Sequence, residues 1–309
     1  MHARSGSRES HRSILVEAEM LDPGVSSGVR RIARPPDPGP RESEEGRLRV
    51  LANDLHVNCQ FSGPRQAPLV VLSHSLGSSG IMWEQQMPVL VDSYRVLRYD
   101  IRGHGGTAAP AGPYTLDELG DDAVAMLDAL DIERVHWVGL SMGGMIGQNL
   151  AIRYPQRLSS LVLCDTTSRL SEQARPLWDA RIAMAEKSGM EPLCGETMAR
   201  WFTPPFIAED GPELKTIREQ FLRTPTSGYV GCCHAIRELD YTERLSSIAL
   251  PVQLIVGAED PTTPATALRT IQEKIPGASL TVIDNGSHLC NVEQPAAFDH
   301  ALLRFLESV

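Results

Sequence analysis

A serine between two glycines is the first feature of this sequence that could do chemistry. Gly139-Leu140-Ser141-Met142-Gly143 fits the pattern G-x-S-x-G, in which a serine occupies a sharp turn between a strand and a helix. The apolar run Val135–Leu140 precedes this serine, as a buried strand would, and a helical pattern from Gly143 to Tyr154 follows it. The alternative is a glycine-rich helix start with an ordinary capping serine. The context favours a nucleophile at Ser141.

A serine hydroxyl needs a base that removes its proton, and the sequence offers nine histidines. His288 lies in the loop directly after the last predicted strand, Leu280–Ile283, at the sheet edge where Ser141 is also expected. We therefore predict that His288 is the general base. His104 is a weaker candidate, and His74 is expected to orient its loop rather than to transfer a proton.

The base in turn needs a carboxylate that fixes its tautomer and stabilises the imidazolium. Asp260 follows the predicted strand Val252–Val256 and gives the chain order Ser, Asp, His that is typical of one hydrolase fold. Asp165, after the preceding strand, is the main rival, and Glu259 is a weaker one. We predict a catalytic triad of Ser141, Asp260 and His288.

A tetrahedral intermediate also needs hydrogen-bond donors for its oxyanion. The backbone N–H of Met142, directly after the nucleophile, is one predicted donor. The other is the N–H of Leu76, in the loop His74-Ser75-Leu76-Gly77-Ser78 that follows the short apolar run Leu69–Ser73. The alternative for that loop is a plain glycine turn. In the next such loop, Asp100 and Arg102 are expected to pair with each other and brace the site.

These residues must be positioned by alternating strands and helices. The predicted strands are Leu48–Phe61 (two strands and a turn at a sheet edge), Leu69–Ser73, Arg95–Asp100, Val135–Leu140, Leu161–Cys164, Val252–Val256 and Leu280–Ile283. Helical periods connect them at Leu116–Leu130, Gly143–Tyr154, Ala265–Ile275 and Pro295–Leu306. The alternation predicts an α/β fold with a mostly parallel sheet flanked by helices.

Two stretches depart from this alternation and suggest the domain boundaries. Residues 1–47 are rich in proline, glycine, serine and charge, and we predict a disordered N-terminal extension. Residues 168–245 are helical by period and punctuated by proline and glycine, which predicts an inserted helical cap. The remaining residues, 48–167 and 246–309, form the predicted core.

Composition limits the partners. The formal net charge of −10 argues against non-specific nucleic-acid binding, which needs lysine and arginine on the surface. No apolar stretch is long enough to predict a transmembrane helix, and the N-terminus does not resemble a secretory signal. No metal or nucleotide motif is present, so no cofactor is predicted.

We interpret the six cysteines as reduced thiols in a cytoplasmic protein, with a disulfide as the alternative. A homodimer is one of the oligomeric states left open.

Together these residues resemble the α/β-hydrolase superfamily, over residues 49–309. Three further stretches resemble its 3-oxoadipate enol-lactonases: His74-Ser75-Leu76-Gly77, Arg200-Trp201-Phe202-Thr203-Pro204 and the segment from His288 to Pro295. The resemblance implies hydrolysis of a small anionic enol-lactone in aromatic catabolism. An anionic substrate would need a cation, and Trp201, Arg200 and Arg237 of the predicted cap are the candidate pocket residues.

The predicted function is therefore hydrolysis of a carboxylic ester or lactone through an acyl-enzyme. A broad-specificity carboxylesterase and an acyl-homoserine lactonase are alternatives. A carbon–carbon bond hydrolase and a cofactor-free perhydrolase share the same triad and are weaker alternatives. A ligand receptor on a decayed hydrolase scaffold is a rival of another class, although such receptors can lose a triad residue and all three are present here.

Overall fold

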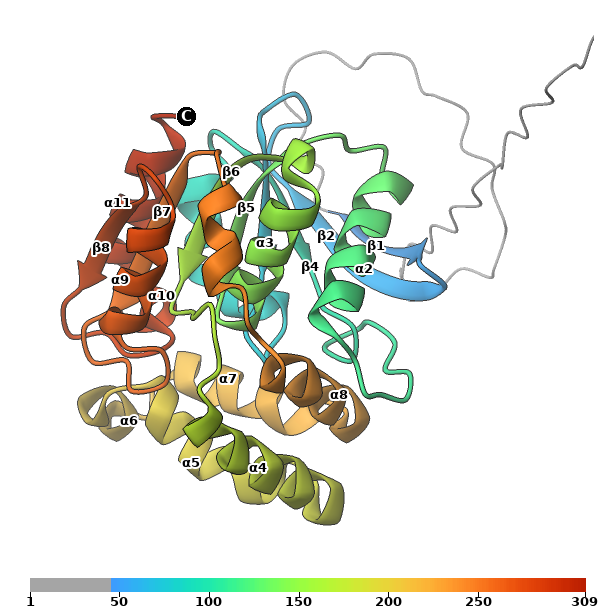
Figure 1. The fold of residues 1–309 in the computed structure, drawn as a ribbon, viewed down its shortest axis with the longest axis vertical. Coiled ribbons are helices and arrows are strands. Elements are labelled where there is room, and N and C mark those ends of the chain that lie inside the picture. Colours follow the sequence, from blue (N-terminus) through green and yellow to red (C-terminus); the bar gives the residue numbers. More distant parts are fainter. Residues whose placement is uncertain (1–45) are drawn as a thin grey trace, which may run out of the picture.

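An eight-stranded sheet organises residues 46–309, the part of the chain that this computed structural model describes (Figure 1). The strands follow the order β1-β2-β4-β3-β5-β6-β7-β8 across the sheet. They are β1 (Gly46–Ala52), β2 (Leu55–Ser62), β3 (Leu69–Ser73), β4 (Arg95–Tyr99), β5 (Val135–Leu140), β6 (Leu158–Cys164), β7 (Val252–Gly257) and β8 (Ser279–Ile283). The pairs β1–β2 and β2–β4 are antiparallel, and all other pairs are parallel. The predicted mostly parallel sheet is confirmed.

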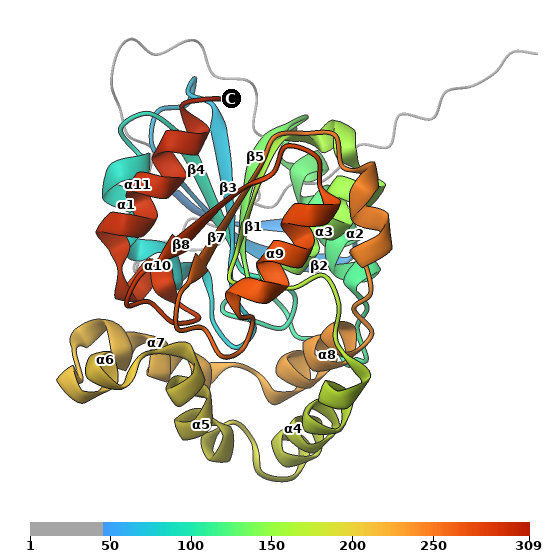
Figure 2. The same ribbon diagram turned by 60° about the vertical axis from the view of Figure 1, so that its left-hand side comes forward.

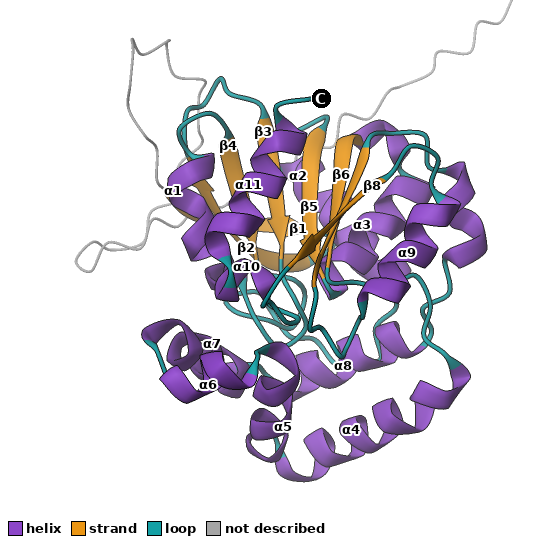
Figure 3. Ribbon diagram, turned by 90° about the vertical axis from the view of Figure 1, so that its left-hand side faces the viewer, coloured by secondary structure: helices purple, strands orange, loops and turns teal. Residues whose placement is uncertain are grey.

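Helices cover both faces of this sheet. The helices are α1 (Met87–Leu90), α2 (Leu116–Ala129), α3 (Met142–Arg153), α4 (Arg175–Ser188), α5 (Glu191–Trp201), α6 (Pro204–Glu209), α7 (Pro212–Arg223), α8 (Thr226–Arg237), α9 (Ala265–Lys274), α10 (Cys290–Glu293) and α11 (Pro295–Leu306). Short 3-10 helices are η1 (Gly80–Gln86), η2 (Pro155–Arg157), η3 (Glu172–Ala174) and η4 (Thr242–Ser247). Figures 2 and 3 show α2, α3 and α9 on one face, with α1 and α11 on the other. Strands that are buried on both faces explain the continuous apolar runs of the sequence.

A hairpin forms one edge of the sheet. Asn53 and Asp54 connect β1 to β2 with positive φ angles of 51° and 58°, as a two-residue hairpin turn requires. This confirms the two strands and turn predicted within Leu48–Phe61. Because β1 begins at Gly46, the predicted core boundary at residue 48 falls inside the strand. The extension predicted for 1–47 lies outside the described residues, apart from 46 and 47.

Five helices, α4 to α8, lie between β6 and β7, and we call them the insertion. No strand element occurs between Cys164 and Val252 in the described chain, and an isolated bridge between Arg169 and Asp240 joins the two ends of the insertion. Proline occupies the first turn of α4, α5, α6 and α7, where it presets φ and removes an N–H that has no partner in the helix. The prolines that interrupt this region of the sequence therefore start its helices.

The insertion lies across the carboxyl ends of the parallel strands (Figures 1 and 3). A Cβ atom added to Gly77, after β3, would be 2.8 Å from the Phe221 side chain of α7. One added to Gly103, after β4, would be 2.4 Å from Gly228 of α8. The loops that follow these strands therefore touch the insertion directly. The predicted cap boundaries, 168 and 245, remain a prediction.

All six cysteines lie in the described part of the chain, and each is a buried free thiol. None of the helices of residues 46–309 is both long and apolar enough to cross a bilayer.

Candidate active site

Ser141 occupies a strained turn between β5 and α3. Its backbone has φ 55° and ψ −112°, a conformation that non-glycine residues rarely adopt. The turn is held on both sides, because the Ser141 N–H donates to the Cys164 carbonyl at 2.9 Å and the Gly143 N–H donates to the His74 carbonyl at 3.1 Å. The strand-to-helix context that the G-x-S-x-G motif predicted is therefore present, and Ser141 lies at its apex.

Close backbone contacts explain the two glycines of the motif. A Cβ atom on Gly139 would be 2.1 Å from the Gly143 carbonyl oxygen. A Cβ atom on Gly143 would be 2.1 Å from the carbonyl oxygen of Ser73, the last residue of β3. No side chain fits at either distance, so both positions must lack a Cβ for the turn to form.

Asp260 and His288 form a buried hydrogen-bonded pair. The His288 Nδ1 lies 2.8 Å from the Asp260 Oδ2, and the two residues are only 1% and 4% exposed. Thr263 supports the carboxylate through its hydroxyl, 2.6 Å from Oδ2, and through its N–H, 3.1 Å from Oδ1. The Thr262 N–H adds a bond of 2.7 Å to Oδ1. Hydrogen bonds within its own loop thus fix the Asp260 carboxylate independently of its bond to the imidazole.

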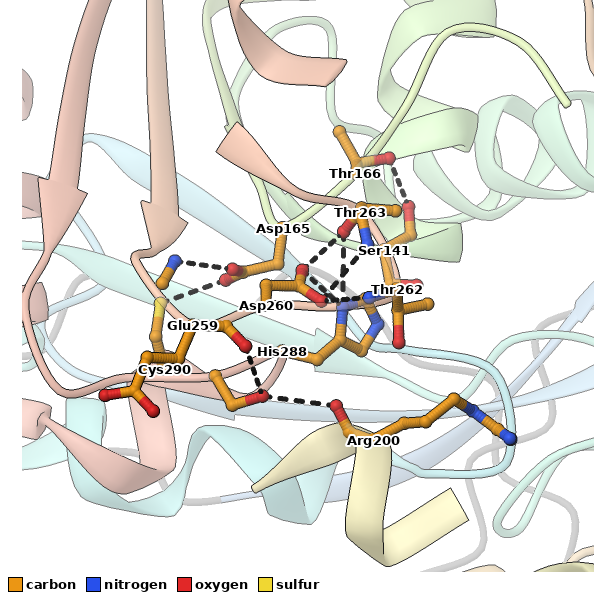
Figure 4. Close-up of polar contacts among 12 residues, drawn as sticks. Ser141, Asp165, Thr166, Arg200, Glu259, Asp260, Thr262, Thr263, His288 and Cys290 are labelled. Atoms are coloured by element: carbon orange, nitrogen blue, oxygen red, sulfur yellow. Dashed lines mark hydrogen bonds and ion pairs between the residues drawn. The ribbon is translucent and has the colours of Figure 1, made fainter. Parts of the chain in front are cut away.

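The electrostatics of this pair favour an ionised carboxylate. Burial by itself would raise the pKa of Asp260, but His288 and the hydrogen bonds from Thr263 outweigh it, and the pKa lies below its usual value. A carboxylate at Nδ1 places a proton on that nitrogen and leaves Nε2 as the basic atom. In the view of Figure 4 the imidazole lies between the Asp260 carboxylate and Ser141.

The two rival acids have other surroundings. Asp165 accepts a hydrogen bond from the Gly257 N–H at 2.8 Å and one from the Cys290 thiol at 2.9 Å. Burial and the neighbouring Asp260 raise the pKa of Asp165 well above its usual value, which favours the neutral form. A neutral acid stabilises an imidazolium poorly. Glu259 is exposed, and its side chain has no hydrogen-bond partner within residues 46–309.

One predicted oxyanion donor, Leu76, lies in the loop after β3 and the other, Met142, is the first residue of α3, and these two segments are hydrogen-bonded to each other. The Gly143–His74 hydrogen bond joins the start of α3 to the loop after β3. The neighbouring N–H groups of Gly77 and Ser141 have acceptors. Those of Leu76 and Met142 have none within the described chain, and both residues are buried. Two unpaired N–H groups on adjoining segments are the arrangement that an oxyanion hole needs.

Two buried histidines hold these loops in place. The His74 Nε2 accepts a bond from the Ile101 N–H, and the His104 Nε2 accepts one from the Gly77 N–H, each at 2.9 Å. The Nδ1 of each ring lies near a backbone carbonyl, so each ring is neutral with its proton on Nδ1. Burial and the adjacent His74 ring lower the pKa of His104 to about 3. His104 thus accepts a hydrogen bond from the loop rather than acting as a base. His74 makes the same kind of contact, in line with the expectation that it orients its loop.

The predicted ion pair between Asp100 and Arg102 is wrong. Asp100 accepts hydrogen bonds from the Gly80 and Gly106 N–H groups and from the Asn58 amide, at 2.8–2.9 Å. The Arg102 guanidinium instead makes a two-point contact with Asp122 of α2, at 2.6 and 2.7 Å. Proximity in sequence suggested the pair, but the loop turns the two side chains toward different elements.

The end of α5 brings two of the predicted pocket residues to the histidine loop. The Arg200 carbonyl accepts a bond from the Ser287 hydroxyl at 3.2 Å (Figure 4), and the Trp201 carbonyl accepts one from the Leu289 N–H at 3.1 Å. The Trp201 ring packs edge-on against Phe221 at 5.7 Å between centroids. Phe221 in turn contacts Gly77, next to the predicted donor at Leu76.

The insertion arginines separate into two groups. Arg237 bonds to Asp179 and Glu238, each at 2.7 Å, on the insertion surface, so the structure does not support its predicted pocket role. Arg181, which sequence reasoning missed, lies 4.8 Å over the Trp178 ring and is near the buried Tyr229, where its charge partly offsets the effect of burial on the pKa of that phenol. Burial and the nearby Arg181 lower the pKa of Arg200. No sequence signal distinguished Arg181 from the other helical arginines.

Known proteins resemble this chain over most of its length. The α/β-hydrolase fold family model matches residues 68–295. A 3-oxoadipate enol-lactonase of Acinetobacter baylyi is 38% identical over 254 residues, which cover 82% of this chain and 94% of that protein. The enol-lactonase of Burkholderia xenovorans LB400 has a similar crystal structure, with a TM-score of 0.81 and 34% identity over 84% of this chain and 99% of that one. A Pseudomonas aeruginosa PA01 hydrolase structure gives a TM-score of 0.81 and 37% identity, with coverages of 84% and 98%.

Proposed function

This chain belongs to the α/β-hydrolase fold family, and from that premise we propose that it hydrolyses carboxylic esters or lactones with Ser141 as nucleophile. The observation that carries the proposal is the buried Asp260–His288 hydrogen bond of 2.8 Å at the same sheet edge as the strained serine turn. An ionised acid, an oriented imidazole and a serine on a sharp turn are the three parts that acyl transfer requires.

In the acylation step, the Ser141 Oγ attacks the carbonyl carbon while its proton moves to the His288 Nε2. The resulting oxyanion is held by the N–H groups of Leu76 and Met142, and Asp260 stabilises the imidazolium. Collapse of this intermediate breaks the bond between the carbonyl carbon and the leaving oxygen, which takes the proton from His288. With a lactone the leaving oxygen stays attached to the acyl group, so the ring opens on the enzyme.

Deacylation repeats these roles with water. His288 takes a proton from the water as its oxygen attacks the acyl carbon, and the same two N–H groups hold the second oxyanion. The proton then returns to the Ser141 Oγ as the acid leaves. No other group is required for either half of this cycle.

The partly buried arginines of the insertion favour an anionic substrate. Arg181 carries the same charge as Arg200 and adds to the effect of burial in lowering the pKa of Arg200. Arg200 already pairs with Glu196 one turn away on α5, whereas Arg181 has no ion-pair partner within the described residues, so a substrate carboxylate would be held chiefly by Arg181. Two relatives of this chain are named 3-oxoadipate enol-lactonase, and the lactone in that name carries such a carboxylate. We therefore propose a carboxylate-bearing lactone, with the insertion acting as a cap over it.

The direct test compares kcat/KM for 3-oxoadipate enol-lactone with that for p-nitrophenyl butyrate on one preparation, with Ser141→Ala as the control. The proposal predicts a large preference for the lactone and loss of both activities in the variant. Arg181→Met should then raise KM for the lactone far more than for the neutral ester.

A broad carboxylesterase or acyl-homoserine lactonase is the second candidate, favoured by the apolar Trp201–Phe221–Tyr229 aromatic row beside the oxyanion loop. Good turnover of neutral esters of several acyl lengths, with a feeble rate on the enol-lactone, would support it over the first.

A further inference from the structure

Two stretches of the sequence that the triad does not explain are hydrogen-bonded to each other. Glu293, at the end of α10, is 8% exposed and accepts bonds at both carboxylate oxygens. Its Oε1 accepts from the Thr203 N–H at 3.0 Å and from the Thr203 hydroxyl. Its Oε2 accepts from the Ser287 N–H at 2.9 Å. One buried carboxylate thus bridges the insertion and the residue that precedes His288.

The bridge belongs to a larger set of bonds around the predicted base. Ser287 also donates its hydroxyl to the Arg200 carbonyl, and Leu289 donates its N–H to the Trp201 carbonyl. Both neighbours of His288 in the chain are therefore bonded to the last two residues of α5, and Thr203, the partner of Glu293, lies in the α5–α6 segment (residues 202–203) that follows them. Among the described residues, the imidazole itself is bonded only through its Nδ1 side, to Asp260 and, at 3.3 Å, to the Thr263 hydroxyl.

The chemistry of the bridge requires a carboxylate. Two N–H groups and one hydroxyl point at Glu293, and only an ionised acid can accept at both ends without presenting a donor to any of them. A buried N–H left without an acceptor costs about 1–3 kcal/mol, so loss of the bridge favours movement of the loop.

We propose that Glu293 is a positioning residue, which couples the insertion to the histidine loop so that His288 keeps its place only while the α5–α6 segment is docked. The proposal rests on the proposed function, in which His288 is the base. It follows that the α5–α6 end of the insertion stays on the core during turnover and that substrate enters past another part of the insertion.

A purely protective role for this contact makes the opposite prediction. Ser141 is only 7% exposed. If Glu293 merely held the insertion closed, its loss would expose the serine, and a small serine-directed reagent would react faster. If Glu293 positions the base, the same loss slows the reaction, because misplacement of a catalytic group by about 1 Å can cost about 100-fold in rate.

The experiment measures the second-order rate constant for labelling by a small alkyl fluorophosphonate, in which the serine oxygen displaces fluoride. The variants are Glu293→Gln, which keeps the size but presents an amide N–H₂ to one of the donors, and Thr203→Val, which removes only the hydroxyl. Glu209→Gln on the exposed end of α6 is the matched control. Melting temperature confirms that each variant is folded, and hydrogen–deuterium exchange of the peptides around 203 and 287 measures whether the two segments loosen together.

We expect labelling of Glu293→Gln to be slower by between about 10-fold and 100-fold, a smaller decrease for Thr203→Val, and none for Glu209→Gln. Exchange should rise at both peptides together. Faster or unchanged labelling of folded Glu293→Gln would overturn the proposal. If that variant does not fold, Thr203→Val decides, and an unchanged rate there overturns it. A wild-type protein that is not labelled at all would instead contradict the proposed function.

Discussion

At the scale of single residues, hydrogen bonding decides which acid supports the base. Asp260 and Asp165 are both buried carboxylates at neighbouring strand ends. Asp260 receives three bonds from Thr262 and Thr263 and faces His288, and these favour its charged form. Asp165 has a backbone N–H and a thiol as partners and lies near the charge of Asp260. The two surroundings thus shift the pKa of the same residue type in opposite directions within one site.

This difference predicts unequal effects of the same substitution. Asp260→Asn should lower kcat by about 10⁴-fold, because the amide favours the wrong tautomer of His288. Asp165→Asn should lower it by less than about tenfold, since it replaces a neutral acid by a neutral amide of the same size. Steady-state kinetics on an activated ester would measure both. A larger loss for Asp165→Asn would transfer the role of the acid to that residue.

At the scale of elements, the strained turn at Ser141 and the loop after β3 form one structural unit. Gly143 contacts the end of β3 and bonds to His74, while His104 holds Gly77. The two proposed oxyanion donors are therefore positioned by contacts between elements, not by the G-x-S-x-G turn alone.

Two glycine-to-alanine changes test that dependence on contacts. Gly143→Ala places a Cβ 2.1 Å from backbone and should lower the free energy of unfolding by at least about 2 kcal/mol. Gly195 is an exposed residue in the interior of α5, and a Cβ atom added there would have no other atom within 4 Å. Gly195→Ala should therefore raise the free energy of unfolding by about 0.5–1 kcal/mol. Urea unfolding of both variants gives the comparison. Equal changes in the free energy of unfolding would mean that the backbone around Gly143 has room for a Cβ atom, which would contradict this packing.

The elements differ in how far sequence alone could predict them. The runs at β3 and β5 were predicted to the residue, because a short apolar stretch that ends in a glycine-containing loop has few alternatives. η1 and α1 were not predicted, since 3-10 turns and a four-residue helix carry no period. Partners distant in sequence were also missed: Arg102 with Asp122, and Glu293 with Thr203. Local patterns do not specify which side chains tertiary packing brings together.

At the scale of the whole molecule, a buried polar cluster joins the first helical segment to the last. The Gln86 amide of η1 donates to the Asn291 carbonyl at 3.0 Å and to the Asp299 carboxylate of α11 at 3.1 Å. Asn291 returns a bond to Gln86. Burial, only partly offset by the Gln86 bond, raises the pKa of Asp299 from 3.8 to about 6.

This raised pKa makes stability depend on pH in a definite direction. The folded state binds the proton of Asp299 more tightly than the unfolded state, so this stabilisation is present at low pH and is lost as pH rises from about 4 through 6. Asp299→Asn should therefore be more stable than the wild type at pH 8, and its advantage should shrink at pH 4.5. Urea midpoints at the two pH values measure this. A stability difference between the variant and the wild type that does not change with pH would show that burial does not destabilise the charged form of Asp299.

Peptide mapping after rapid acid quench of the reaction with p-nitrophenyl butyrate tests the central claim most directly. We predict a butyryl group on the peptide that contains Ser141, formed before steady state and absent in Ser141→Ala, which should also lose turnover. Unchanged turnover in Ser141→Ala, or an acyl group on another residue, would contradict the assignment of Ser141 as the nucleophile.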